Sequence, residues 1–181
     1  MPLTSPLVNT ALVVVDLQRG TAANPFFSPL DAVAQHADAL TAAFRRHGLP
    51  VVIAAFALSR LDADGQPSRA EPDGFREPLA ALDVQPDDVR VTRPAWSVFS
   101  GTGLDKTLRD RGITRLVLTG VATSIGVEST AREAHDLGYQ LVIASDAVTD
   151  LRAETHENSI QRIFPLLGQV ATTEEILAAL D

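Results

Sequence analysis

Cysteine is absent from this 181-residue chain. Its absence excludes disulfide bonds, thiolate zinc sites and thiol nucleophiles together. Long apolar runs are also missing, since LPVVIAAFAL (49–58) is about half the length that a membrane span needs. The amino-terminal residues have neither the basic start nor the cleavage site of a signal peptide. We therefore expect a cytoplasmic protein.

Excess positive charge is missing as well, because the formal net charge is −8 at pH 7. A chain this acidic is not expected to have nucleic acid or an anionic membrane as its main partner. A small anionic substrate remains compatible, since a pocket can be locally basic inside an acidic protein. Hydrophobic residues make up 45% and charged residues 21%, which is typical of soluble globular proteins. The length predicts a single domain over residues 1–181.

Short buried runs alternate with amphipathic ones along the chain. Strands are predicted at residues 11–16, 51–56, 89–93, 115–121 and 139–147, and helices at 31–48, 102–112, 122–138 and 152–168, before a last strand and helix. This alternation predicts an α/β fold, an open parallel sheet between two layers of helices. Residues 59–90 are polar and rich in Pro, Gly and Asp, which predicts a long functional or interface loop.

In an open parallel sheet the active site lies at the carboxyl ends of the strands, which selects Asp16, Arg93 and the turn at 120–126. Asp16 is either a cap or a partly desolvated carboxyl group suited to proton transfer. Arg93 is either a surface ion-pair partner or a fixed cation for a carboxylate. Trp96, the only tryptophan, is either a core residue or a wall for a flat ligand.

Gly126 follows the turn near the start of a predicted helix. It serves either close packing or an unusual dihedral angle, or it leaves helix N–H groups open to developing negative charge. The four histidines show no metal-ligand spacing and are expected at the surface or in caps; they are His36, His47, His135 and His156.

The segments VVVDLQ (13–18) and RPAWSVF (93–99), together with TGVATSIGVESTA (119–131), resemble the isochorismatase-like hydrolases, also called the cysteine hydrolases. The resemblance runs from about residue 11 to the carboxyl terminus and is weakest over 57–90. It implies a three-layer α/β/α sandwich with a six-stranded parallel sheet. Family members are usually dimers or larger, so a homodimer or higher homo-oligomer is expected.

In the thiol-dependent members of this family the catalytic triad is Asp, Lys and Cys. Asp16 matches the Asp, whereas Arg93 aligns with the Lys and Gly126 with the Cys. A covalent thioester route is therefore closed to this chain. Isochorismatases without the thiol look similar at the turn, where Ile precedes Gly. They protonate a vinyl ether through the Asp, and the glycine leaves room for the substrate.

The resemblance thus implies a catalytic set of Asp16, Arg93 and Gly126. It implies substrate-binding positions at Gln18, Trp96, Phe99, Ala122 and Ile125. The Val121–Ala122 peptide bond is expected to be cis, with the N–H groups of residues 122–126 facing the ligand. No cofactor is expected, and no metal either, because the Asp-x-His metal motif does not follow Asp16.

Three functions remain open at this point. The first is acid-catalysed hydrolysis of a small, isochorismate-like vinyl ether by Asp16. The second is binding of a small molecule without turnover, or service as a structural or regulatory subunit. The third is hydrolysis of an amide by water that Asp16 activates.

Overall fold

The structure is a computed structural model that describes residues 3, 7–58 and 70–180. The strands are β1 (Thr10–Val15), β2 (Val51–Phe56), β3 (Val89–Arg93), β4 (Arg115–Val121), β5 (Gln140–Thr149) and β6 (Gln169–Ala171). The α-helices are α1 (Arg19–Ala22), α2 (Leu30–Arg46), α3 (Leu104–Asp110), α4 (Glu128–Asp136), α5 (Ala153–Asn158), α6 (Phe164–Leu167) and α7 (Thr173–Ala178). Two π-helical turns, η1 (Thr123–Val127) and η2 (Ser159–Ile163), precede α4 and α6.

The strands form one sheet of six in the order β3-β2-β1-β4-β5-β6, and every neighbouring pair is parallel. The predicted parallel sheet is confirmed. The chain builds outward from β1 to one edge through β2 and β3, then returns to β4 and builds toward the other edge. The carboxyl ends of β1 and β4 therefore lie side by side where the strand order reverses, and open α/β sheets bind their ligands at this point.

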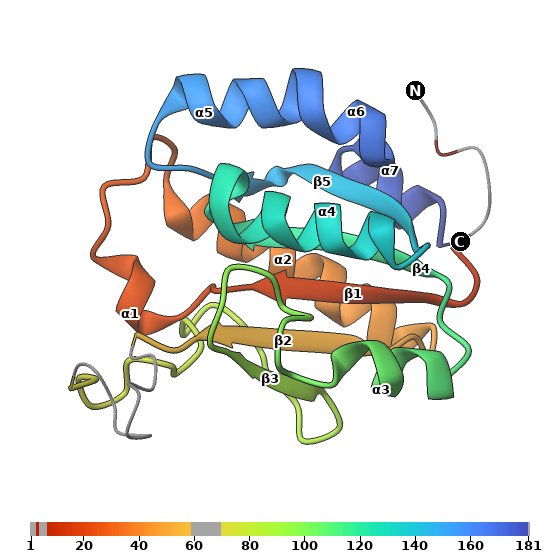
Figure 1. Cartoon of the computed structure of the whole chain (residues 1–181), viewed down its shortest axis with the longest axis horizontal. Helices are drawn as coiled ribbons and strands as arrows, with labels where there is room; N and C mark the ends of the chain where they lie inside the picture. Colours follow the sequence, from red (N-terminus) through yellow and green to blue (C-terminus); the bar gives the residue numbers. More distant parts are fainter. Residues whose placement is uncertain (1–2, 4–6, 59–69, 181) are drawn as a thin grey trace.

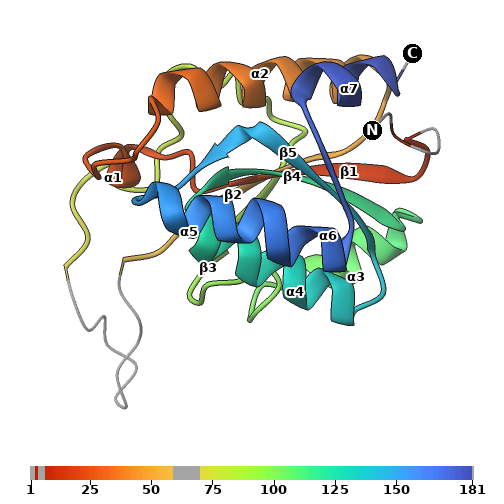
Figure 2. The same cartoon turned by 90° about the horizontal axis from the view of Figure 1, so that it is seen from above.

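Helices cover both faces of the sheet (Figures 1 and 2). Figure 2 shows α2 and α7 on one face and α3, α4, α5 and α6 on the other. The predicted apolar face of α2 is buried against β1 and its neighbours through Val33, Ala37, Leu40, Ala43 and Phe44. Continuous β-branched runs such as VVV (13–15) are buried on both sides because helices pack on both faces.

Two predicted helices differ from the continuous elements that their sequences indicate. The helix expected at 122–138 opens as η1, in which the Val127 N–H donates to the Ala122 carbonyl five residues back, at 3.2 Å. The helix expected at 152–168 is divided into α5, η2 and α6. Pro165 lies at the start of α6, and since it has no N–H it cannot continue the preceding ladder of hydrogen bonds.

Part of the predicted 59–90 loop, residues 59–69, lies outside the described residues. The later part docks on the segment that follows β1. Gln18 and Pro78 form an antiparallel bridge, and the Arg19 N–H donates to the Glu77 carbonyl at 2.8 Å. None of the helices in the described part of the chain has the length and apolar character required to cross a bilayer.

Candidate functional site

Asp16, Arg93 and Gly126 meet at one end of the sheet. Asp16 directly follows β1, Arg93 is the last residue of β3, and Gly126 lies in η1 just after β4. All three line the same cavity of about 260 Å³. Strand β2 separates β3 from β1, so the Arg93 side chain reaches across the end of β2 toward Asp16.

The cavity is mostly apolar apart from the Asp16–Arg93 pair. Its lining residues are Asp16, Thr21, Asn24, Phe26, Phe56, Arg93, Trp96, Val121, Ala122, Ile125, Gly126 and Leu151. Trp96 is 57% exposed, which makes it a wall at the mouth rather than a core residue. The cavity therefore combines an aromatic and aliphatic wall with one buried charged pair.

Asp16 and Arg93 form a forked ion pair. The Arg93 Nε donates to Asp16 Oδ1 at 3.1 Å and the Arg93 Nη2 donates to Asp16 Oδ2. Their side chains are only 5% and 4% exposed. The Arg93 Nη1 donates to the Ala95 carbonyl, and the guanidinium carbon lies 5.0 Å from the centre of the Phe56 ring. Arg93 is therefore a buried, fixed cation and not a surface ion-pair partner.

Burial and Arg93 act in opposite directions on the pKa of Asp16. Burial raises the pKa of Asp16 above that of an exposed aspartic acid, and the hydrogen bonds and charge of Arg93 offset part of this rise. The Asp16 backbone has a φ of +54°, an uncommon conformation for a residue with a side chain. Its N–H donates to the Ala54 carbonyl at 2.9 Å, and its carbonyl accepts from the Thr21 hydroxyl at 2.7 Å. The carboxyl group is thus held in place and can retain a proton at higher pH than usual.

Gly126 makes room for Arg93. A Cβ atom built on Gly126 would lie 2.8 Å from Arg93 Nη2, 3.1 Å from the Val121 carbonyl oxygen and 3.2 Å from Val15 Cγ1. Real Cβ atoms essentially never approach a heavy atom to less than 3.0 Å. Gly126 also lines the cavity, and a side chain at this position would first have to displace the Arg93 guanidinium, so the expectation that the glycine leaves room for substrate stays a prediction.

Backbone N–H groups of the turn after β4 donate within the turn and to Asp150, which directly follows β5. The Val121–Ala122 peptide bond is cis. The Ser124 N–H donates to Asp150 Oδ2 at 2.6 Å, and the Ile125 N–H donates to the Ala122 carbonyl at 3.0 Å. The expectation that the N–H groups of residues 122–126 face a ligand is wrong for Ser124 and Ile125.

Trp96, Ala122 and Ile125 line the cavity with the catalytic set, whereas Gln18 and Phe99 do not. Gln18 is 1% exposed and its amide is fully engaged with backbone groups: Nε2 donates to the Phe56 and Phe75 carbonyls, both at 3.1 Å, and Oε1 accepts from the Phe56 N–H at 2.7 Å.

Phe99 is 7% exposed and stacks on Tyr139 at 5.7 Å between ring centres. Gln18 and Phe99 are therefore corrected from binding positions to structural ones. Their polar or aromatic groups contact other parts of the protein and do not line the cavity.

Sequence reasoning missed several residues at this site. Phe56 ends β2, so the strand-end rule that found Asp16 could have found it. Asn24 and Phe26 lie in an irregular segment that has no periodicity to reveal them.

His156 is half-buried, with its Nδ1 2.9 Å from the Thr123 hydroxyl and its ring 4.9 Å from Phe27. Burial lowers the pKa of His156. The expectation of a surface or capping histidine is therefore corrected for this residue, which packs behind the turn. Among residues 7–58 and 70–180, no three His, Asp or Glu side chains are grouped so that they could hold a metal ion.

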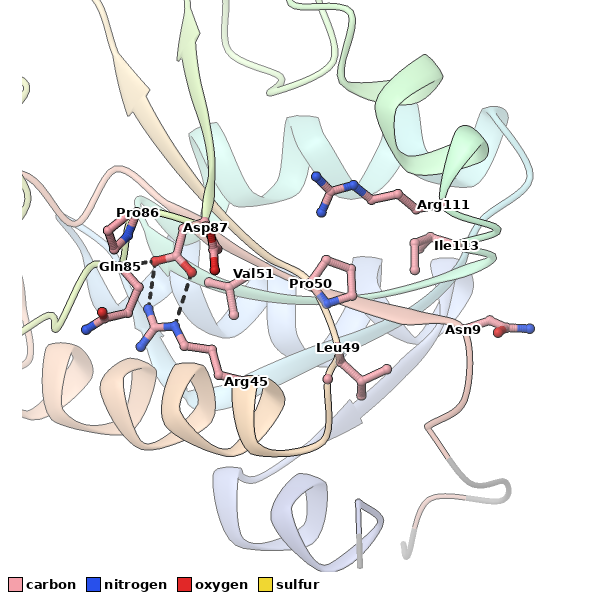
Figure 3. A pocket seen from close by; sticks show the side chains of 12 residues that line it. Asn9, Arg45, Leu49, Pro50, Val51, Gln85, Pro86, Asp87, Arg111 and Ile113 are labelled. Carbon is pink, nitrogen blue, oxygen red and sulfur yellow. Dashed lines mark hydrogen bonds and ion pairs between the residues drawn. The ribbon is translucent and has the colours of Figure 1, made fainter.

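A larger cavity of about 1100 Å³ lies at the opposite, amino-terminal end of the strands (Figure 3). Arg45 at its wall is already bound by Asp88, with the Arg45 Nε 3.1 Å from Asp88 Oδ1 and Nη2 2.7 Å from Oδ2. This pair joins α2 to the segment before β3. The larger cavity therefore holds the Arg45–Asp88 ion pair, and the smaller one holds the buried Asp16–Arg93 pair.

The geometry agrees with the comparison to known proteins. Residues 10–175 match the Isochorismatase domain family. The chain belongs to the isochorismatase family. It is 41% identical to the isochorismatase family protein YecD from Escherichia coli over 94% of this chain and 96% of that protein. An isochorismatase family protein from Burkholderia thailandensis is 40% identical, with a TM-score of 0.89 over 99% of this chain and 98% of that one.

Other proteins that are similar to this chain are hydrolases by name. A cysteine hydrolase from Pseudomonas syringae is 25% identical, with a TM-score of 0.85 over 98% of both chains. The ureidoacrylate amidohydrolase RutB from Variovorax paradoxus is 38% identical over 102 residues, which are 56% of this chain and 40% of that protein. These relatives support a hydrolase in general.

Proposed function

We propose that this protein hydrolyses a small anionic vinyl ether of the isochorismate type, with Asp16 as the proton donor and without a covalent intermediate on the protein. One observation supports this most. A buried carboxyl group with a raised pKa faces an apolar cavity, while the position aligned with the nucleophile is a glycine whose side-chain space is filled by Arg93.

The chemistry needs an acid and water, and no nucleophilic side chain. Asp16 gives its proton to the terminal carbon of the enol ether, which leaves a positively charged carbon bonded to the ether oxygen. Water adds to that carbon and loses a proton. The resulting hemiketal breaks its bond to the ring oxygen, which takes up the proton of the hemiketal hydroxyl. The products are pyruvate and the ring alcohol, and Asp16 recovers its proton from water. Arg93 binds the substrate carboxylate, because its charge is permanent and its donors are fixed.

Two other functions are tested in the same experiment. Similarity to ureidoacrylate amidohydrolase RutB favours an amide substrate, for which Asp16 would activate water. The closed ion pair, in which both Asp16 oxygens accept from Arg93, favours a site that binds a ligand without turnover.

The test is a pyruvate-coupled assay with isochorismate, chorismate and related enol ethers, alongside ammonia release from ureidoacrylate. We expect pyruvate from at least one enol ether and a loss of at least about 100-fold in rate for Asp16→Asn, the usual scale for a general acid. Asp110→Asn, which makes the same change on the exposed surface of α3, should retain the wild-type rate.

Three results would contradict the proposal. Ammonia without pyruvate would establish the amidase, and neither product from a folded protein would favour the binding function. An Asp16→Asn protein as active as wild type would remove Asp16 from the mechanism.

A further inference from the structure

The cavity at the carboxyl ends of β1 and β4 contains one positive and one negative group. Among its twelve lining residues only Asp16 and Arg93 have side chains that carry charge, and these two are paired with each other. The other charged or titratable groups nearby are already engaged elsewhere. Asp150 and His156 bind the far side of the turn, and Arg19 forms an exposed pair with Glu77. With both groups ionised, the empty cavity is therefore close to electrically neutral.

Arg93 still has donors for a ligand. A guanidinium has five N–H bonds, and within the described residues three of them go to Asp16 and the Ala95 carbonyl, one each from Nε, Nη1 and Nη2. One N–H on each terminal nitrogen remains. A ligand carboxylate that reaches these donors lies close to Asp16, because the same Nη2 already binds Asp16 Oδ2.

Two carboxylates on one guanidinium would leave a net negative charge inside an apolar wall. An uncompensated charge in such a place is strongly unfavourable, and like charges at short range favour protonation of one of them. Asp16 is the buried partner that can take up a proton. We propose that the cavity binds one carboxylate of its ligand on Arg93, and that each ligand bound is accompanied by uptake of one proton by Asp16.

This inference rests on the proposed function, since it takes the cavity as the substrate site, and it specifies how the substrate carboxylate is bound. A second carboxylate on the ligand finds no cation among the lining residues and has to stay in water at the mouth beside Trp96. Binding also prepares catalysis, because the proton taken up with the substrate carboxylate is the one that Asp16 then donates. Substrate binding thus protonates the carboxyl group that serves as the acid.

Titration calorimetry tests the inference without any turnover, with benzoate as the probe. The binding heat is measured at one pH in buffers of different ionisation enthalpy, and its slope gives the number of protons taken up. We expect about one proton per benzoate for the wild type. Benzoate affinity should fall about tenfold per pH unit where Asp16 is ionised in the free protein.

A second ligand and two variants sharpen the test. Benzamide, the neutral isostere, should bind with no proton uptake. Asp16→Asn should bind benzoate with no uptake and with a pH-independent affinity. The surface variant Asp110→Asn should behave as wild type. Should Asp16→Asn not fold, the wild-type slope and pH dependence still decide the question.

The inference is overturned if folded wild-type protein binds benzoate without proton uptake, or does not bind it at all. It is also overturned if Asp16→Asn takes up the same proton. Because no bond is broken in this experiment, a failure here is distinct from a failure to release pyruvate.

Discussion

Replacing Gly126 by alanine tests the close contact between position 126 and the Arg93 guanidinium. The added Cβ would meet Arg93 Nη2 at 2.8 Å, with the Val121 carbonyl oxygen and Val15 Cγ1 close behind. Neither β4 nor β1 can retreat, because both are central strands of the sheet. Arg93 has to move, although its guanidinium is held by Asp16 and the Ala95 carbonyl.

The size of the effect depends on how far Arg93 moves. Overpacking that leaves the ion pair intact costs about 1–3 kcal/mol. Displacement that leaves Asp16 or Arg93 buried without its partner costs about 3–5 kcal/mol. Gly126→Ala should therefore lower the free energy of unfolding by between about 1 and 5 kcal/mol. Arg93→Lys should relieve part of this loss, because an ammonium group has no second terminal nitrogen beside position 126.

A double-mutant cycle in urea, followed by circular dichroism, measures this coupling. We expect Arg93→Lys and Gly126→Ala to couple favourably by about 0.5–3 kcal/mol. Gly103→Ala is the matched control, since Gly103 has a φ of +71° and nothing within 4 Å of an added Cβ. It should be destabilised by backbone strain alone, with no rescue by Arg93→Lys.

A Gly126→Ala protein as stable as wild type would refute the reasoning. So would a result in which Arg93→Lys restores no more stability to Gly126→Ala than to Gly103→Ala. The same contact predicts that Gly126→Cys gains a usable thiol only together with Arg93→Lys.

Two further predictions concern the groups behind the turn. Burial lowers the pKa of His156 from 6.5, so its contribution to stability is present above about pH 6.5 and is lost as the pH falls through the lower folded value. His156→Gln should flatten this part of the pH dependence of unfolding, and an unchanged profile would contradict it. Asp150→Ala leaves the Ser124 and Leu151 N–H groups without their acceptor and should cost about 1–3 kcal/mol in urea unfolding and weaken benzoate binding. Asp110→Ala should change stability by less than about 0.5 kcal/mol, and an Asp150→Ala effect that small would refute the role.

The sequence alone was sufficient for the sheet. Runs such as VVV (13–15) predict strands buried on both faces, and their alternation with amphipathic helices predicts that those strands are parallel. Parallel strands end at a common edge, so Asp16 and the turn that contains Gly126 could be placed together from strand ends alone. What local periodicity could not show was where a helix changes to a π-helical turn, as at η1 and η2.

The tertiary structure decided what each side chain at that edge does. Arg93 crosses the end of β2 to reach Asp16, 77 positions away in the chain, and occupies the space beside Gly126. Gln18 follows Asp16 by two residues, yet its amide is consumed by the backbones of Phe56 and Phe75. Strand ends are set by local patterns, whereas the partner of a buried polar group is set by whichever neighbours the fold brings within hydrogen-bonding distance.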